Sequence, residues 1–453
     1  MRYQHLLSAL LVSCAMAAKM PKKIYGVNLG SWLLIEPWMI PREWAAMGGQ
    51  TCDDCSKCIA SEFEFAKAYP SLVDETMRGH WESFFNFEDV KTLSAAGINT
   101  VRIPLGYWIV EDLVDRNKEF YPRGGLQQLK RGLKQLRGAG IGAILDHHAL
   151  PGVQTPQQMF TGRCTKDVQF YTRYNYHRAL IWSAVMTAIS HFDVDFWGVW
   201  AIEAVNEPIM DANKTPGYRD FQKNFVSVVR AVELAIEIKL EDIKLARPIP
   251  IMATFQQSLK AVADSGNFNA EVSSALKDAL PMMEKMGFLP DVPFNRLLVQ
   301  NDPLYTNFMD IGWQYNNPAN PADAAIGPQI YDSHLYYSFG GVTDATEDAY
   351  LRHICNLDQR IANNAGLGNK PLYFGEWALS TQFEASDAFL RKWADAQKWA
   401  YGKAAGWMFW NYKMEEGSPY NRQWSYLKGL EKGFFTQNPA KFNDPHVCDP
   451  YRR

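Results

Sequence analysis

The chain has 453 residues, a formal net charge of −3 and 47% hydrophobic residues, enough for one large domain or two. It contains no block of Lys or Arg, so the composition argues against binding to nucleic acid or to an anionic membrane. Its 15 Trp, 21 Tyr and 25 Phe suit a cleft that stacks on sugar rings, but they suit the core of a large α/β enzyme equally well.

Residues 1–18 have the pattern of a secretory signal peptide. Arg2 supplies a positive charge, the segment from Leu6 to Ala15 is apolar, and small residues follow at the expected cleavage position. This run is too short to span a bilayer, and no other stretch of the sequence is long and apolar enough to do so. We therefore expect a secreted protein, extracellular or in the cell wall and not inserted in a membrane, with a single domain over residues 19–453.

Six cysteines lie outside the predicted signal peptide. They are Cys52, Cys55, Cys58, Cys164, Cys355 and Cys448. An even number in a secreted chain predicts three disulfides, although the pairing does not follow from the sequence. The cluster CDDCSKC is also compatible with a metal site, but no histidine lies close to it in sequence. We therefore predict disulfides, which brace loops and the C-terminal segment, and no metal.

A short apolar segment that ends in a polar residue recurs along the chain, and helical stretches lie between these segments. The predicted strands are 25–30, 100–105, 142–148, 199–207, 249–255, 329–337, 371–378 and 406–413. Strands that alternate with helices form a parallel sheet, and eight of them predict a (β/α)8 TIM barrel. An open doubly wound sheet would need a glycine-rich turn after its first strand, and GVNLGSW is not one. We expect the two long connections, 31–95 and 256–328, to form walls over the cleft.

The active site of such a barrel lies where the C-terminal ends of the strands meet. Nearly every predicted strand carries a polar or aromatic residue at this end: Asn28, Arg102, His148, Asn206, Glu207, His334, Tyr336, Glu376 and Trp410. Each histidine alone is also compatible with a core position, but their place in this set favours function. Glu203 has the same strand parity as Glu207, so we expect it to face the barrel interior as a structural partner.

Two of these residues, Glu207 and Glu376, are carboxylates on different strands. Hydrolysis of a glycosidic bond uses such a pair, in which one protonated carboxyl donates to the leaving oxygen and the other attacks the anomeric carbon or activates water. The reaction requires no metal and no other cofactor. The paired histidines of DHH at 146–148 have no further ligand at metal-binding spacing. The pattern therefore predicts a glycoside hydrolase without a cofactor.

The motifs NEP at 206–208 and GEW at 375–377 resemble glycoside hydrolase family 5, whose catalytic glutamates stand on strands four and seven. Longer segments resemble one branch of this family, the fungal exo-β-1,3-glucanases, from residue 24 to about 430. These segments are GVNLGSWLLIEPWMIP, HWESFFNFEDVKTLSAAGINTVRIPLGYW, DHHALPGVQ, AIEAVNEP and GWMFWNYK.

The resemblance implies a retaining mechanism with Glu207 as the acid/base and Glu376 as the nucleophile. It also implies that seven further residues bind the sugar: Glu36, Arg102, His148, Asn206, His334, Tyr336 and Trp410. Glu207 must then hold a proton at the working pH, whereas Glu376 must stay ionised, for which Arg102 and the Tyr336 hydroxyl are available. Four other tryptophans are compatible with either packing or sugar binding: Trp32, Trp38, Trp377 and Trp407.

The sequence departs from the exo-β-1,3-glucanase pattern in loops around the cleft. Ser31 stands where NLGGW has glycine, DHHALPGVQTP replaces DLHGAPGSQNG, and the connection 256–328 is longer. We expect a monomeric exo-β-1,3-glucanase that releases glucose from a β-glucan polysaccharide or oligosaccharide. The alternatives are a β-1,6-glucanase or a β-glucan transglycosylase on the same scaffold and, in another class, a glucan-binding protein without activity. The presence of both glutamates argues against the last.

Overall fold

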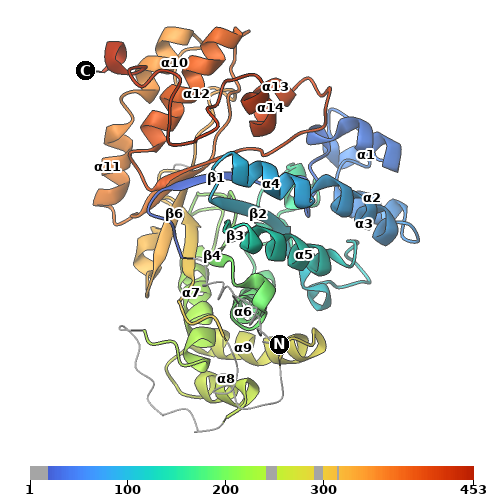
Figure 1. The fold of residues 1–453 in the computed structure, drawn as a ribbon. Coiled ribbons are helices and arrows are strands. Elements are labelled where there is room, and N and C mark those ends of the chain that lie inside the picture. Colours follow the sequence, from blue (N-terminus) through green and yellow to red (C-terminus); the bar gives the residue numbers. More distant parts are fainter. Residues whose placement is uncertain (1–18, 241–252, 290–298, 314–315, 453) are drawn as a thin grey trace, which may run out of the picture.

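The computed structural model describes residues 19–240, 253–289, 299–313 and 316–452 (Figure 1). The predicted signal peptide, 1–18, lies outside the described residues. Eight parallel strands form a closed barrel in chain order, which confirms the predicted (β/α)8 fold. They are β1 (Ile24–Asn28), β2 (Thr100–Gly106), β3 (Gly142–Ala149), β4 (Val199–Glu203), β5 (Tyr305–Met309), β6 (Gln329–His334), β7 (Leu372–Glu376) and β8 (Gly406–Phe409).

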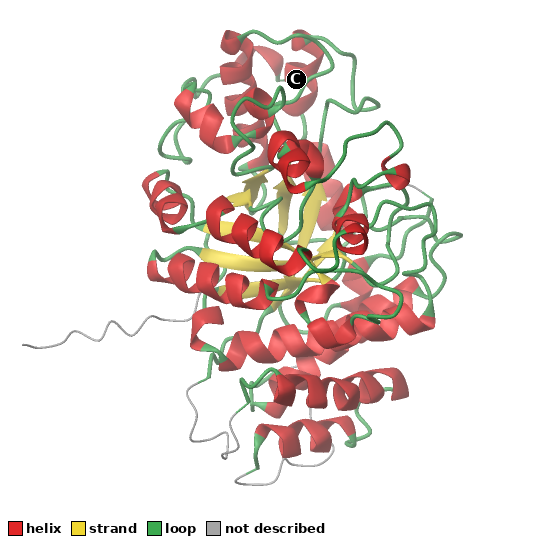
Figure 2. Cartoon of the chain, turned by 90° about the vertical axis from the view of Figure 1, so that its right-hand side faces the viewer, coloured by secondary structure: helices red, strands yellow, loops and turns green. Residues whose placement is uncertain are grey.

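Helices surround the barrel, so that the strands occupy the centre of the molecule (Figure 2). They are α1 (Pro41–Met47), α2 (Glu62–Ala68), α3 (Val73–Phe84), α4 (Phe87–Ala95), α5 (Gly125–Gly138), α6 (Arg173–Phe192), α7 (Tyr218–Ala235), α8 (Phe255–Ala263), α9 (Ala270–Lys285), α10 (Glu347–Ile354), α11 (Asp358–Gly366), α12 (Asp387–Tyr401), α13 (Asn421–Trp424) and α14 (Tyr426–Glu431). In α5, Leu129, Leu133 and Leu136 recur every three to four positions and are buried, the pattern of a helix with one face on the core.

The fifth strand differs from the prediction. Of the predicted segment 249–255, residues 249–252 lie outside the described residues, while Thr254 caps helix α8 and Phe255 begins it. The barrel uses β5 instead, which pairs with β4 and β6. Thr306 hydrogen-bonds to Gln329 of the adjacent strand β6, and Asn307 to Tyr373 of β7. This strand therefore has a polar centre and lacks the apolar run that marked the others.

The connection 256–328 therefore contains helices and a strand, and it is not one long wall. Helices α8 and α9 pack against α6 and α7 as an outer layer (Figure 1). Among the described residues of this segment, Trp313 alone lines the cleft described below. The other long connection does contribute to the wall, through Glu36 and Trp38.

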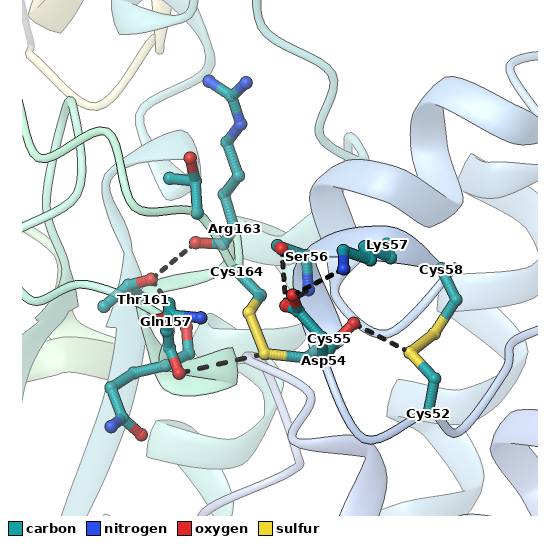
Figure 3. The surroundings of a disulfide bond; sticks show 12 residues. Cys52, Asp54, Cys55, Ser56, Lys57, Cys58, Gln157, Thr161, Arg163 and Cys164 are labelled. Carbon is teal, nitrogen blue, oxygen red and sulfur yellow. Dashed lines mark hydrogen bonds and ion pairs between the residues drawn. A yellow bond between two sulfur atoms is a disulfide. The ribbon is translucent and has the colours of Figure 1, made fainter.

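Three disulfides join the six cysteines, as the even number predicted. The pairs are Cys52–Cys58, Cys55–Cys164 and Cys355–Cys448. Cys55–Cys164 links the β1–β2 connection to the loop after β3 (Figure 3), and Cys355–Cys448 attaches the C-terminal segment to the end of α10. Within the part of the chain that the structure describes, every helix is too short or too polar to cross a membrane.

Candidate active site

A cleft of about 580 Å³ opens at the C-terminal ends of the barrel strands. Its lining residues are Glu36, Trp38, His148, Thr155, Gln158, Phe160, Asn206, Glu207, Trp313, Tyr336, Phe339, Glu376, Trp410, Tyr420 and Trp424. Much of the wall is aromatic, which suits the flat apolar faces of sugar rings. A larger hollow of about 850 Å³ lies beside α10, but it is lined by none of the predicted site residues.

The structure brings the predicted site residues together. Seven of them line the cleft directly: Glu36, His148, Asn206, Glu207, Tyr336, Glu376 and Trp410. The other two, Arg102 and His334, are buried beneath it and contact the glutamates from below. Residues of six different strands or strand ends thus converge on one floor, because the barrel places all C-terminal ends on one face.

Glu207 and Glu376 are close neighbours on this floor, with His334 between them. The Nδ1 atom of His334 lies 2.8 Å from Oε1 of Glu207 and 3.5 Å from Oε2 of Glu376. One oxygen of each carboxylate and this nitrogen all lie within 4.8 Å of one another. Such a triad is close enough to hold a metal ion, but the negative charges of Glu376 and Asp332 raise the pKa of His334 against the effect of burial, which favours a protonated ring that donates hydrogen bonds.

Glu376 is the last residue of β7 and is held by donors on both oxygens. Arg102 Nη1 donates to Oε1 at 2.9 Å, and the Tyr336 hydroxyl donates to Oε2 at 2.8 Å. Burial raises the pKa of the Glu376 carboxyl to about 8, while His334, Arg102 and the Tyr336 hydroxyl act in the opposite direction. The site therefore takes a carboxyl out of water but surrounds its charged form with cations and donors.

Arg102 is fully buried inside the barrel and is surrounded by acids. Its guanidinium lies 2.8 Å from Glu203, 2.9 Å from Glu376, 3.1 Å from Asp146 and 3.4 Å from Asp332. Burial lowers the pKa of Arg102, but these carboxylates, Asp146 foremost, outweigh it and raise the pKa overall. The expected position of Glu203 inside the barrel is confirmed, since it is fully buried and accepts a hydrogen bond from Arg102.

Sequence reasoning did not identify Asp146 and Asp332. Each stands two residues before a predicted histidine, His148 or His334, on the same strand. Alternate residues of a strand point to the same side, so strand parity was a signal that could have placed both in the site. Asp146 Oδ2 lies 2.5 Å from His148 Nδ1, and Asp332 Oδ1 lies 3.6 Å from His334 Nε2.

His148 and Trp410 form one side of the floor. Their rings stack with centroids 5.6 Å apart and an interplanar angle of 14°. Burial lowers the pKa of His148 well below its usual range, which favours a neutral ring. Its Nε2 lies 3.4 Å from the Asn206 amide nitrogen, and the Asn206 amide oxygen accepts from Arg102 at 2.8 Å.

Glu36 stands at the edge of the cleft, where Trp38 Nε1 donates to its Oε2 at 2.9 Å. Burial raises the pKa of Glu36 to about 8. Among the four tryptophans left open by the sequence, Trp38 lines the cleft, whereas Trp32, Trp377 and Trp407 are buried in the core. The remaining wall residues come from loops, one 3-10 turn and the short helix α13, all too short to show a periodic pattern in the sequence: Thr155, Gln158, Phe160, Trp313, Phe339, Tyr420 and Trp424.

Known proteins resemble this chain along most of its length. The family model described as Cellulase (glycosyl hydrolase family 5) matches residues 67–416. A probable glucan endo-1,6-beta-glucosidase B of Neosartorya fischeri is 30% identical over 440 residues, which cover 94% of this chain and 90% of that protein. A probable glucan 1,3-beta-glucosidase A of Aspergillus fumigatus is 26% identical over 442 residues, with the same shares of 94% and 90%.

Among solved structures, rutinosidase from Aspergillus niger superposes with a TM-score of 0.60 at 16% identity, covering 91% of this chain and 98% of that one. At this identity the likeness concerns the fold. The family match spans the barrel from before β2 to beyond β8 and includes Glu207 and Glu376. The chain therefore belongs to glycosyl hydrolase family 5 and is a glycoside hydrolase.

Proposed function

We propose that this protein is a secreted endo-β-1,6-glucanase that cleaves its glucan with retention of the anomeric configuration. The observation that carries the retaining mechanism is the closeness of Glu207 and Glu376, whose carboxylate oxygens lie within 4.8 Å. Retaining enzymes hold their two carboxyl groups about 5–5.5 Å apart, whereas inverting enzymes separate them by about 6.5–9.5 Å to admit a water.

The linkage preference is supported by the relatives and departs from the exo-β-1,3-glucanase expected from sequence motifs. The relative described as an endo-1,6-beta-glucosidase is 30% identical, and the one described as a 1,3-beta-glucosidase is 26% identical over a similar length. The motifs that suggested the 1,3 branch lie around the floor of the cleft. Hydrolysis of either linkage requires this floor, so these motifs do not distinguish the two kinds of enzyme. Linkage depends on the loops, where this sequence departs from the exo-β-1,3 pattern.

In the first step, Glu207 donates its proton to the glycosidic oxygen while a carboxylate oxygen of Glu376 attacks the anomeric carbon. The bond to the leaving sugar breaks as the glycosyl-enzyme ester forms. In the second step, Glu207 takes a proton from water, whose oxygen attacks the same carbon and releases Glu376. Arg102 and Tyr336 hold Glu376 for attack, and Trp410 offers its ring to the reacting sugar.

The test compares a β-1,6-glucan (pustulan), a β-1,3-glucan (laminarin) and an aryl β-glucoside. We expect pustulan to be cleaved first into a series of oligosaccharides, with the newly formed ends in the β configuration by NMR. Release of glucose alone from laminarin would instead establish the exo-β-1,3 activity, the second candidate, which the 26% identical relative favours. Products longer than the substrate would identify a transglycosylase.

The proposal includes export of the chain as a monomeric single domain over 19–453. Three disulfides support it, because disulfides persist in oxidising compartments. We expect the protein recovered from the culture medium of an expressing fungus to begin at about residue 19 by N-terminal sequencing, and to elute as a monomer in size-exclusion chromatography. An uncleaved protein retained in the cells would contradict the export.

A further inference from the structure

Glu207 has a backbone conformation that residues other than glycine rarely adopt. Its φ is 40°, in the left-handed region. Glu207 also lies beyond the end of β4, whose last residue is Glu203. It is therefore outside the backbone hydrogen bonds that join the barrel strands. A strained residue of this kind persists only when its surroundings hold it in place.

Two consecutive residues of the loop after β3 hold this turn by its carbonyl groups. Thr155 Oγ1 donates to the carbonyl oxygen of Glu207 at 2.6 Å. Gln154 Nε2 donates to the carbonyl oxygen of Asn206 at 3.1 Å and to that of His148 at 2.7 Å. The loop after β3 thereby ties the turn after β4 to the end of β3.

The two donors are placed differently. Gln154 is fully buried, so it is a fixed part of the barrel top. Thr155 is half-buried and lines the cleft beside Glu207. The carbonyl group and the side chain of Glu207 both turn about its N–Cα bond. A change of φ that relaxed the left-handed conformation would therefore break the 2.6 Å bond to Thr155 and move the carboxyl away from its 2.8 Å contact with His334.

We propose that Thr155 is a positioning residue for Glu207: its hydroxyl holds the left-handed backbone from which the Glu207 carboxyl reaches the glycosidic oxygen. The inference rests on the proposed acid/base role of Glu207. It assigns to Thr155 an effect on the chemical steps that need proton transfer, and no bond to the sugar.

The test uses two substitutions of one side chain. Thr155→Val keeps the shape and removes the hydroxyl, whereas Thr155→Ser keeps the hydroxyl. We expect kcat on pustulan to fall about 10- to 100-fold in Thr155→Val with KM little changed, since small misplacements of a catalytic group have effects of this size. Thr155→Ser restores the wild-type rate. Formation of the glycosyl-enzyme from a dinitrophenyl β-glucoside, which needs little protonation, falls far less.

A matched control lies in the same loop. Thr165 Oγ1 accepts from the backbone N–H of Asp167 at 3.1 Å and is not part of the cleft lining, so Thr165→Val retains the wild-type kcat. All rates are expressed per folded molecule, measured by near-ultraviolet circular dichroism, so that a loss of folding is not read as a loss of catalysis.

Three outcomes overturn the proposal. The first is a raised KM with unchanged kcat in Thr155→Val, which would make the hydroxyl a sugar ligand. The second is an equal loss on pustulan and in glycosyl-enzyme formation from the aryl glucoside, and the third is a Thr155→Ser variant as slow as Thr155→Val. The proposed acid/base role of Glu207 can be refuted independently of Thr155, because in that case Glu207→Ala would keep wild-type activity.

Discussion

Individual side chains decide where the protons of the catalytic pair reside. Burial raises the pKa of the Glu376 carboxyl to about 8, and the nearby Glu207 adds to this rise, whereas His334, Arg102 and Tyr336 oppose it. Arg102 and the Tyr336 hydroxyl both donate to Glu376. These hydrogen bonds favour the charged form of Glu376, which the proposed nucleophile requires.

Glu207 and Glu376 should fail in different ways when they are replaced. Glu376→Gly removes the nucleophile, so even an activated aryl glucoside should not turn over until azide fills the space and forms the inverted α-glycosyl azide. Glu207→Ala should form the glycosyl-enzyme but hydrolyse glucan about 10²–10⁴-fold more slowly, and azide should rescue it with the retained β configuration. NMR of the azide products is the measurement. The same anomer from both variants would refute the two roles.

Ser31, which also has a left-handed φ of 56°, holds the Glu36 end of the cleft. Its Oγ accepts from the Glu36 N–H at 2.9 Å and lies 3.1 Å from the Glu36 carbonyl oxygen. Ser31→Ala loses both hydrogen bonds and keeps the backbone strain. We therefore expect its free energy of unfolding, measured in urea, to be lower than that of the wild type by about 1–3 kcal/mol. We also expect its KM for glucan to rise. Ser31→Gly should lose less stability because glycine relieves the strain. A more stable Ala than Gly variant would contradict this account.

At the scale of elements, the loop after β3 supports the site from several directions. It supplies Thr155, Gln158 and Phe160 to the cleft wall, and Tyr171 at its far end accepts from the backbone N–H of Ile209, two residues after Glu207, at 2.7 Å. Cys55–Cys164 fastens the same loop to the β1–β2 connection (Figure 3). One loop thus couples the wall of the cleft to the turn that carries Glu207.

Removal of the Cys55–Cys164 disulfide, by replacing both residues with serine, should lower the free energy of unfolding by about 4–5 kcal/mol. Its cysteines are 109 residues apart in sequence, whereas those of Cys52–Cys58 are 6 apart. The stabilisation by a disulfide grows with the logarithm of the length of the loop that it closes. The double serine variant of Cys52–Cys58 should therefore lose roughly 2.5 kcal/mol less free energy of unfolding than the double serine variant of Cys55–Cys164. Urea unfolding of both variants measures this, and equal losses would argue against an entropic origin.

At the scale of the whole molecule, the fold keeps several carboxyl groups out of water. Burial raises the pKa of Glu62 and of Glu203 to about 8 and that of Asp146 to about 7. Glu62 lies outside the cleft lining, where its Oε1 accepts from the backbone N–H of Ile35 at 2.7 Å. Its titration therefore reports on the fold without disturbing the catalytic pair.

The pH dependence of stability should differ between the wild type and Glu62→Gln. The pKa of Glu62 in the folded protein, about 8, is raised above the unfolded value of 4.5. Its contribution to the free energy of unfolding is therefore fully present below pH 4.5 and is lost as the pH rises toward 8. Between these pH values the free energy of unfolding of the wild type should fall by roughly 3–5 kcal/mol more than that of Glu62→Gln. Urea unfolding at several pH values is the measurement, with Glu64→Gln on the same helix as control. Parallel curves for wild type and Glu62→Gln would disprove the assignment.

The sequence by itself determined the barrel, the family and most of the residues that meet at the floor of the cleft, because each depends on a local pattern. Buried parallel strands appear as short apolar runs, and Glu207 and Glu376 follow such runs within the recognisable motifs NEP and GEW. The even number of cysteines likewise predicted disulfides without their pairing. The sequence did not predict β5 because Thr306 and Asn307 break its apolar run and hydrogen-bond to side chains of β6 and β7.

Only the tertiary structure decided the relations between distant segments. The four carboxylates around Arg102, the pairing of Cys55 with Cys164 and the Thr155 hydroxyl on the Glu207 carbonyl join residues from separate parts of the chain. No local periodicity encodes these contacts, since they arise when barrel closure brings all strand ends to one face. The loops that surround this face follow no repeating pattern, so the shape of the cleft became visible only in the folded chain.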